Sequence, residues 1–401
     1  MKISGMRKYF FFLWTVISIN VYAQNRDSVW HYDSQILPGA NDLFHYKPII
    51  ENKKIAVVAN QTSVVNRTHL VDTLLALHFN VVKVFAPEHG FRGDVENGGL
   101  INDTTDKKTG LQIVSLYGKH KKPTADDLSN VDVVLFDIQD VGARFYTYIS
   151  TLQYVMEACA ENKKKLIVLD RPNPNGFYID GPVLDRKFTS FVGMQPVPVV
   201  YGMTIGEYAR MINSEGWLEK GILCNLKVIP CKNYDHTKYY RAEIPPSPNL
   251  PNMNAIYLYP SLCFFEGTPL SIGRGTDMPF QVIGFPSEMQ SGFRFMPLST
   301  KASVHPPYEN QYCEGIDLRP LVIQIRNSKQ LMIKYVLNYY NVYPAKDKYF
   351  TDYFNTLAGN EFLQQQIKAQ ISEQDIRTTW QPDIDKFKLI RKKYLLYKDF
   401  E

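Results

Sequence analysis

The chain has 401 residues, of which 45% are hydrophobic and 13% aromatic, and it contains 23 glycines and 24 prolines. This ordinary globular composition excludes a disordered, collagen-like or coiled-coil protein. At roughly 150 residues per domain, the length predicts two domains.

The first 23 residues have the pattern of a secretory signal peptide. Lys2, Arg7 and Lys8 precede an apolar run from Tyr9 to Val21, and the small Ala23 stands at the expected cleavage site. The run is shorter than the ~20 apolar residues that a membrane-spanning helix needs. We therefore expect cleavage after residue 23 and an exported chain with no stable membrane insertion.

The net charge of the cleaved chain argues against a nucleic-acid partner. Cleavage removes three basic residues, so Lys and Arg fall from 45 to 42 against 40 Asp and Glu, and the formal charge falls from +5 to +2. Nucleic-acid binding normally needs a strongly basic surface. We expect no nucleic acid among the partners.

The cysteines predict no metal centre. Their number is odd, which leaves at least one thiol unpaired, and none has the CxxC or Cys/His spacing of a metal site. Cys224 and Cys231 are near enough in sequence to pair across a short strand, but we favour cysteines buried as small apolar side chains. The five are Cys159, Cys224, Cys231, Cys263 and Cys313.

Between residues 50 and 175, short apolar runs alternate with helical patterns. Short runs rich in Val, Ile and Leu are typical of buried parallel strands, and helices between them imply βαβ crossovers. We predict an α/β domain with a doubly wound parallel sheet. The runs are 55–59, 70–77, 81–86, 113–117, 131–136, 145–160 and 166–169, and apolar spacings of three and four predict a helix over 144–160.

After Asp170 the sequence changes to turn residues, Arg-Pro-Asn-Pro-Asn-Gly, which indicates a joint between domains. We predict a signal peptide over 1–23, an α/β domain over 24–200 and a smaller α+β domain over 201–401. Thr204 and Glu207 have the spacing of a capping box, so a helix should begin there. The prolines around Asn249 exclude helix and central strand at 245–251. Helical periodicity returns at 321–340, 361–371 and 384–397.

Polar residues follow several of the predicted strands. In open parallel sheets, ligands bind beyond the carboxyl ends of the strands, so these residues should share one polar edge. No GxGxxG or GxxxxGK[ST] string follows a strand, which disfavours nucleotide binding, and we expect no cofactor. The residues at this edge are Asn60, Gln61, Thr62, Glu88, His89, Arg92, Asp137, Gln139, Asp140, Arg144, Asp170, Arg171 and Asn173.

Glu88 is the strongest candidate for catalysis at this edge. A half-buried carboxyl group beside aromatic residues is typical of a general acid. The alternative is that Glu88 pairs with Arg92 or caps a turn, but charged residues here are costly to hold without a use. His89 is a candidate substrate contact, although a lone histidine more often orients a neighbour.

The aspartates have two interpretations each. Asp137 and Asp140 end an apolar run, so one of them is a second catalytic carboxyl group or both cap the following helix. Asp170 either accepts sugar hydroxyl groups or holds its loop together through side-chain turns, and the loop role is favoured.

A second constellation lies downstream. Glu266 stands among aromatic residues, and Arg274 lies between two glycines. The pair is either an acid or base next to an anion clamp, or an ion pair that braces a loop.

Together these strings resemble one family, the exported bacterial exo-β-N-acetylmuramidases (NamZ), long known as a domain of unknown function. The similarity spans nearly the whole chain after residue 23. The matching strings, in order, are Gly39-Ala40, Ala59 to Thr62, Pro87 to Gly93, Phe136 to Arg144, Asp170 to Pro174, Pro248 to Pro251, Glu266 to Thr276 and Arg391 to Tyr397.

The resemblance implies a Rossmann-like N-terminal domain, a smaller C-terminal domain and a cleft between them. It also implies a glycosidase that releases terminal β-linked N-acetylmuramic acid from the non-reducing end of peptidoglycan disaccharides or muropeptides, in the periplasm or outside a bacterial cell. The family's cleft glutamate falls on Glu88. An exported sugar- or muropeptide-binding protein without turnover is the alternative.

Further roles follow from general glycosidase chemistry. With Glu88 as the acid, the second group is Glu266, Asp140 or the acetamido oxygen of the substrate, and retention or inversion stays open. The lactyl carboxylate of N-acetylmuramic acid needs a cation, for which Arg274, Arg144 and Arg92 are candidates. The expected sugar contacts are Asn60, Gln61, His89, Asp137, Tyr146, Asp170 and Asn249, with Phe91 and Phe264 as further rings.

Overall fold

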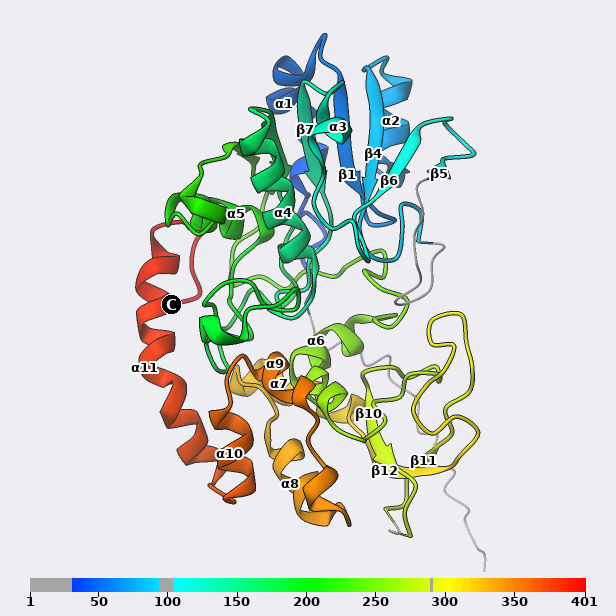
Figure 1. Ribbon diagram of the computed structural model, residues 1–401, viewed down its shortest axis with the longest axis vertical. Coiled ribbons are helices and arrows are strands. Elements are labelled where there is room, and N and C mark those ends of the chain that lie inside the picture. Colours follow the sequence, from blue (N-terminus) through cyan, green and yellow to red (C-terminus); the bar gives the residue numbers. More distant parts are fainter. Residues whose placement is uncertain (1–30, 94–103, 289–290) are drawn as a thin grey trace, which may run out of the picture. The chain divides into compact units, whose positions relative to one another are not determined.

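The computed structural model describes residues 31–93, 104–288 and 291–401 (Figure 1). The predicted signal peptide over 1–23 lies outside the described residues. The predicted α/β class is confirmed, because a seven-stranded sheet with helices on both faces dominates the first half of the chain. Its strands are β1 (Ile55–Ala59), β4 (Val81–Ala86), β5 (Thr104–Thr105), β6 (Gln112–Ser115), β7 (Val133–Asp137), β8 (Lys165–Leu169) and β9 (Asn225–Ile229).

The strand order of this sheet is β5-β6-β4-β1-β7-β8-β9, and every pairing is parallel except that of β5 with β6. All residues of β1 and β7 are buried, as continuous apolar runs predict for a sheet covered on both faces. The chain builds the sheet outward from β1 in one direction and from β7 in the other. The order therefore reverses between β1 and β7. Strand β9 lies beyond residue 200, and the division into two domains there stays a prediction.

Helices cover both faces of the sheet. On one face, α1 (Leu43–Ile50) and α2 (Leu70–Ala76) share a core with Val57 and Leu135. On the other face lie α4 (Tyr148–Glu161) and α5 (Ile205–Ser214), and the Cα of Gly206 comes so close to Val228 that a Cβ atom would lie 2.7 Å from that side chain. Alternate strand residues point to opposite faces, so each strand contributes to both cores. A short helix, α3 (Ala125–Leu128), precedes β7.

The two helix predictions of the first half have different outcomes. The capping box is confirmed: Glu207 N–H donates to Thr204 Oγ1 at 3.2 Å, and Thr204 N–H donates to the Glu207 carboxylate at 2.9 Å. The helix predicted from residue 144 begins only at Tyr148. Before it, Ala143 forms a β-bridge with Val200 instead of continuing a helix. The preceding residue, Gly142, has a left-handed conformation (φ 74°). The residues just before α4 are thereby left for the functional site.

The second half of the chain is α+β, as predicted. A three-stranded antiparallel sheet in the order β10-β12-β11 packs with helices, and a β2–β3 hairpin follows β1 in the first half. The elements are β2 (Val64–Val65), β3 (Thr68–His69), α6 (Met253–Leu262), the 3-10 turn Cys263–Gly267, β10 (Val282–Phe285), β11 (Arg294–Phe295), β12 (Cys313–Asp317), α7 (Val322–Ser328), α8 (Lys334–Val342), α9 (Asp352–Ala358), α10 (Phe362–Lys368) and α11 (Glu373–Lys392).

The tail helices differ in detail from the prediction. The helix expected over 321–340 is two helices, because Lys329 takes a left-handed conformation (φ 52°) at the end of α7. The helix expected over 384–397 is the end of α11, and the chain leaves helical geometry after Lys392. The proline-rich segment 245–251 is irregular, as expected.

The cysteines of the chain are buried and unpaired, and Cys224 and Cys231 form no disulfide. This agrees with their interpretation as apolar side chains. None of the helices in the described ranges combines the length and the apolar character that a membrane crossing requires.

Candidate active site

A cavity of about 430 Å³ brings residues of both halves of the chain around Glu88, and we call it the Glu88 cavity. Six of the predicted site residues line it: Glu88, His89, Tyr146, Asn249, Glu266 and Arg274. The other lining residues are Tyr117, Phe145, Thr147, Tyr148, Phe191, Val192, Ser247, Leu250, Tyr259, Phe280 and Tyr353.

Glu88 stands in the turn that follows β4. Gly90 N–H donates to the Pro87 carbonyl at 3.0 Å and closes this turn. Thr147, at the start of α4, donates its hydroxyl group to Oε2 of Glu88 at 3.0 Å. Burial, together with the nearby Glu88 carboxyl group, raises the pKa of Tyr117 to about 12, so its phenol is a neutral hydrogen-bonding partner of Glu88. Glu88 does not pair with Arg92, whose guanidinium is held by Asp72 and Asp106, so that part of the structural alternative is wrong.

His89 occupies a strained backbone position in the same turn. Its φ is 70°, in the left-handed region that favours glycine, and only 4% of the residue is exposed. Its Nε2 lies 3.2 Å from Ser247 Oγ in the proline-rich segment. Strain of this kind persists where the surrounding structure fixes it, often at functional sites. His89 thus holds the proline-rich segment against the turn that carries Glu88.

Glu266 and Arg274 supply the charged groups from the second half of the chain. Arg274 donates Nε and Nη2 to the same Glu266 oxygen, at 2.9 and 2.5 Å. The guanidinium also lies 4.8 Å from the centre of the Phe280 ring. Its Nη1 is enclosed and donates no hydrogen bond within the described residues. The ion pair of the bracing alternative is present, and both residues also line the cavity, while the role of acid or base beside an anion clamp stays a prediction.

Aromatic side chains form much of the remaining wall. Tyr146 packs edge to face on Tyr148 and Tyr259, with ring centres 4.8 and 5.6 Å apart. The hydroxyl groups of Tyr146 and Tyr148 donate to the Pro246 carbonyl at 2.9 and 3.2 Å. Tyr353, from α9, is 40% exposed. Aromatic surface of this kind suits the apolar face of a sugar ring.

Asn249 reaches the cavity from the proline-rich segment, whereas Asn60 and Gln61 stand behind its wall. Asn249 Nδ2 donates to the Ala302 carbonyl at 3.0 Å, and its Oδ1 has no partner in the described chain. Asn60 donates to the Tyr148 hydroxyl at 3.0 Å. Gln61 donates to the carbonyls of Pro245 and Pro246. Asn60 and Gln61 thus support the wall of the cavity, and their direct contact with a sugar stays a prediction.

Asp137 and Asp140 do not line the cavity. Asp137 is fully buried and binds the Arg171 guanidinium at 2.6 and 2.9 Å. Asp140 accepts hydrogen bonds from Tyr201 and from the Gly142 N–H, and burial raises its pKa to about 6. Neither caps the following helix, whose N-cap is Thr147. Asp140 thus has structural partners and does not line the Glu88 cavity, and its catalytic role stays a prediction.

Two of the three candidate arginines, Arg144 and Arg92, do not line the Glu88 cavity. The Arg144 guanidinium is fully buried and donates to four backbone carbonyls, those of Pro182, Val197, Leu357 and Ala358, at 2.7–3.0 Å. Arg92 is held by Asp72 and Asp106. The donors of Arg144 are occupied by backbone carbonyls and those of Arg92 by carboxylates. Arg274 is the one of these three arginines that lines the cavity. Phe91 and Phe264 are buried in the core and do not line it either.

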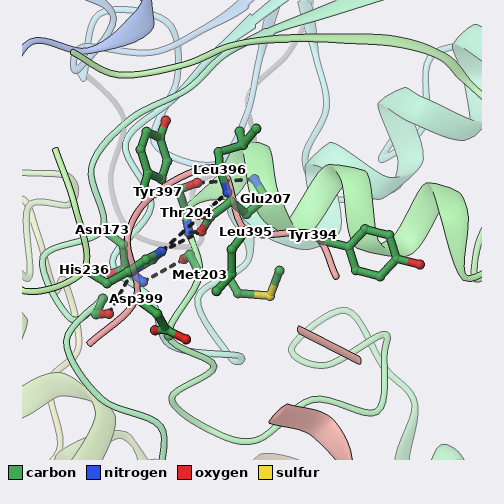
Figure 2. Close-up of polar contacts among 12 residues, drawn as sticks. Asn173, Met203, Thr204, Glu207, His236, Tyr394, Leu395, Leu396, Tyr397 and Asp399 are labelled. Atoms are coloured by element: carbon green, nitrogen blue, oxygen red, sulfur yellow. Dashed lines mark hydrogen bonds and ion pairs between the residues drawn. The ribbon is translucent and has the colours of Figure 1, made fainter. Parts of the chain in front are cut away.

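Asp170 joins β8 to the C-terminal tail and lies away from the cavity. It accepts hydrogen bonds from Thr204 Oγ1, Gly206 N–H and the Tyr397 hydroxyl, at 2.7, 2.7 and 2.5 Å. Beside it, Glu207 contacts His236 and accepts the Leu396 N–H at 2.8 Å (Figure 2). Asp170 is fully buried and connects three segments of the chain, which agrees with the favoured role of holding its loop in place.

Several cavity residues were missed by sequence reasoning. Tyr117 follows a strand, so the rule that selected Glu88 would also have found it. Thr147 and Tyr148 were hidden within a predicted helix. Tyr353 lies in α9, far along the chain, and no local pattern distinguishes it.

No group of three or more His, Cys, Asp or Glu side chains in the described ranges is arranged to hold a metal ion. The chemistry that these residues offer is proton transfer by carboxyl groups in a partly aromatic cavity, with one guanidinium in the wall.

Comparisons with known proteins agree over most of the chain. The family model described as "Exo-beta-N-acetylmuramidase NamZ, N-terminal" matches residues 55–254, and the corresponding C-terminal model matches residues 257–397. The peptidoglycan beta-N-acetylmuramidase NamZ of Bacillus subtilis (strain 168) is 35% identical over 373 residues, which cover 88% of this chain and 89% of that protein.

Two crystal structures of DUF1343 family proteins from Bacteroides fragilis NCTC 9343 are similar in fold. One is 46% identical with a TM-score of 0.85, and covers 91% of this chain and 100% of that one. The other is 30% identical with a TM-score of 0.80, and covers 90% and 99%. The chain therefore belongs to the exo-beta-N-acetylmuramidase NamZ family.

Proposed function

We propose that this protein is a glycosidase that releases β-linked N-acetylmuramic acid from the non-reducing ends of peptidoglycan-derived disaccharides or muropeptides. The observation that carries the proposal is the Glu88 cavity, where Glu88 faces a wall that contains Glu266 and Arg274. Its relative from Bacillus subtilis is a peptidoglycan beta-N-acetylmuramidase, which supports the same substrate class.

Glu88 is the proposed general acid. Glycosidases protonate the oxygen of the leaving sugar with one carboxyl group, while a second group attacks the sugar or activates water. The turn at the end of β4 and the hydrogen bond from Thr147 hold the Glu88 carboxyl group at the cavity. Proton transfer by a positioned side chain contributes about 100- to 10,000-fold to a rate.

Glu266 is the proposed second carboxyl group, because Asp140 lies outside the cavity. Arg274 binds one Glu266 oxygen from two nitrogens, which fixes the orientation of the carboxylate. The other oxygen has a single weak contact, with Cys263 Sγ at 3.4 Å. A fixed carboxylate of this kind is suited to attack the sugar or to activate water.

Arg274 is also the proposed reader of the lactyl group. N-acetylmuramic acid differs from N-acetylglucosamine by a lactyl ether with a carboxylate. Arg274 lines the Glu88 cavity, and its Nη1 lacks a hydrogen-bond partner within the described residues; a buried donor without a partner is costly. Because this atom is enclosed, the guanidinium must shift toward the cavity to meet the substrate. A charge-assisted bond to the lactyl carboxylate would remove this cost.

Export through cleavage of residues 1–23 is part of the proposal. Peptidoglycan lies outside the cytoplasmic membrane, so an exported form in the periplasm or the medium would meet its fragments during cell wall turnover and muropeptide recycling. The mass of the protein recovered from the cell envelope tests this, since a chain that retains residues 1–23 would contradict it.

The deciding experiment is release of chromophore from para-nitrophenyl β-N-acetylmuramic acid, with the N-acetylglucosamine analogue as the control. We expect release from the muramic compound alone. Binding of both compounds without release from either would contradict the glycosidase and favour a sugar-binding protein.

A further inference from the structure

A second cavity, of about 240 Å³, lies at the carboxyl ends of the central strands, and we call it the Arg171 cavity. Residues that follow three strands line it: Thr62 after β1, Gln139 after β7 and Arg171 after β8. The strand order reverses between β1 and β7. In open α/β sheets this reversal point is where ligands bind, and the Glu88 cavity instead follows β4 and β6.

The Arg171 cavity and the Glu88 cavity are separate. They share no lining residue. The segment around Pro245 and Pro246 lies between them, and Gln61 donates to both of these carbonyls at 3.1 and 3.2 Å. The hydroxyl groups of Tyr146 and Tyr148, on the Glu88 side, donate to the Pro246 carbonyl. A ligand in one cavity therefore leaves the other accessible.

Arg171 brings a nearly buried donor to this cavity. The residue is 3% exposed, and Nε and Nη2 bind Asp137 at 2.6 and 2.9 Å. Its Nη1 makes no hydrogen bond within the described residues, yet it is not among the atoms that are sealed from solvent. The remaining donor capacity of this guanidinium is thus accessible from the cavity.

Gln139 and Tyr240 add polar capacity of the same kind. Gln139 is 2% exposed and donates its amide to the carbonyls of Asp140 and Pro172 at 2.8 and 2.7 Å, which leaves its Oε1 as an acceptor. Tyr240 is 9% exposed, and its hydroxyl group makes no hydrogen bond in the described chain. Neither atom is sealed from solvent. Nearly buried polar atoms with spare capacity, all lining one cavity, are expected where a ligand completes the hydrogen bonding.

The charges of the wall are balanced. Arg171 is paired with Asp137 behind the wall, and at the exposed rim Arg67 and Glu243 are of opposite sign. An anion would therefore gain little net attraction. Each hydroxyl group of a polyol both donates and accepts, which matches a wall of mixed donors and acceptors beside the tyrosine ring.

The volume limits the size of the ligand. At about 30 Å³ for each water molecule, the cavity corresponds to roughly eight waters. This lies below the ≈ 300–1,000 Å³ of cavities that hold drug-sized ligands. We propose that the Arg171 cavity is an accessory site for one uncharged sugar ring or a polyol of similar size, distinct from the site around Glu88.

The test is calorimetric titration of the full protein with two uncharged monosaccharides that lack an acetamido group, glucose and galactose, and with acetate and inorganic phosphate as anions. Tyr240→Trp fills the Arg171 cavity, and Tyr353→Trp is the matched change at the Glu88 cavity. We expect sugar binding that Tyr240→Trp weakens at least tenfold and Tyr353→Trp leaves unchanged. Glu88→Gln should also leave it unchanged, which separates this proposal from the proposed function.

Other outcomes would overturn the accessory site. They are a loss of sugar binding in Tyr353→Trp but not in Tyr240→Trp, tighter binding of acetate or phosphate than of either sugar, and no sugar binding at all. Hydrolysis of the muramic substrate at the normal rate by Tyr240→Trp shows that this variant is folded. If it does not fold, Tyr240→Phe removes only the hydroxyl group and should still weaken sugar binding several-fold, and unchanged binding in this variant would contradict the proposal.

Discussion

The hydroxyl group of Thr147 lies 3.0 Å from Oε2 of Glu88, and this contact joins the start of α4 to the end of β4. Two elements that are distant in sequence thereby hold one carboxyl group at the cavity. The orientation of Glu88 depends on the sheet, because β4 and the helix that follows β7 set the two ends of the contact.

Glu88→Gln should abolish turnover and preserve binding. The amide keeps the size of the carboxyl group and its contact with Thr147 but carries no acidic proton, so we expect kcat to fall about 100- to 10,000-fold. Steady-state hydrolysis and direct binding of N-acetylmuramic acid measure the two effects. Glu51→Gln, at an exposed position after α1, is the control. Near-normal kcat in Glu88→Gln would rule out Glu88 as the acid.

Glu266→Gln should lower kcat by a similar factor with a small change in KM. Glutamine still offers an oxygen to Arg274, so the wall is retained while the carboxylate is lost. If Glu266 attacks the sugar, added azide should restore turnover and yield a glycosyl azide. An unaltered kcat would assign the second role to the acetamido oxygen of the substrate.

Arg274→Lys should weaken recognition of the lactyl carboxylate. Lysine keeps the charge but loses the planar fork, and a charge-assisted hydrogen bond contributes about 1.5–3 kcal/mol, or about 10- to 150-fold in affinity. Competitive inhibition of hydrolysis by N-acetylmuramic acid and by N-acetylglucosamine separates recognition from bracing. We expect inhibition by N-acetylmuramic acid to weaken and inhibition by N-acetylglucosamine to stay the same. Equal weakening of both would mean that Arg274 serves only to hold Glu266, and Arg92→Lys controls for the substitution itself.

Arg144→Lys should destabilise the fold without changing KM. Its guanidinium donates to the carbonyls of Pro182 and Val197 and to those of Leu357 and Ala358 at the end of α9. The single ammonium group of lysine cannot donate to all four. We expect the free energy of unfolding to fall by about 3 kcal/mol, because buried carbonyls lose charged donors. Urea unfolding measures this, with exposed Arg186→Lys as the control. A normal stability together with a raised KM would return Arg144 to the substrate site.

Asp170 should make the fold less stable as pH rises. Burial raises its pKa from 3.8 to about 7, opposed by the hydrogen bond from Tyr397. The folded state therefore keeps a proton that the unfolded chain loses above pH 4. The stabilisation is complete below the unfolded pKa and disappears as pH rises through 7. Asp140, with a pKa of about 6, acts in the same direction.

Asp170→Asn resembles the protonated form and should remove this part of the pH dependence. Between pH 4.5 and 8, urea unfolding should show a loss of stability in the parent protein that exceeds the loss in Asp170→Asn by up to about 3 kcal/mol, at about 1.4 kcal/mol for each pKa unit between pH 4.5 and 7. Equal losses in both proteins would contradict the protonation of Asp170.

The sheet could be predicted from the sequence because its strands are continuous apolar runs, as in Ile55–Ala59, and because Thr204 and Glu207 cap a helix through local bonds. Local patterns cannot show which strand-end residue faces the cavity. Asp140 and Glu88 both follow strands, but Asp140 is covered by Tyr201 while Glu88 meets residues from the second half of the chain. The position of Tyr353 depends wholly on that long-range packing.

The contacts of the last residues have a consequence for the timing of folding. Leu396 and Tyr397 are the partners of Glu207 and Asp170, two buried carboxyl groups that lie near the middle of the chain. A growing chain lacks these partners until Leu396 and Tyr397 have been synthesised, and buried carboxyl groups without partners are costly. The hydrogen bonding of Asp170 and Glu207 is therefore completed late, after residues 1–395 have been made.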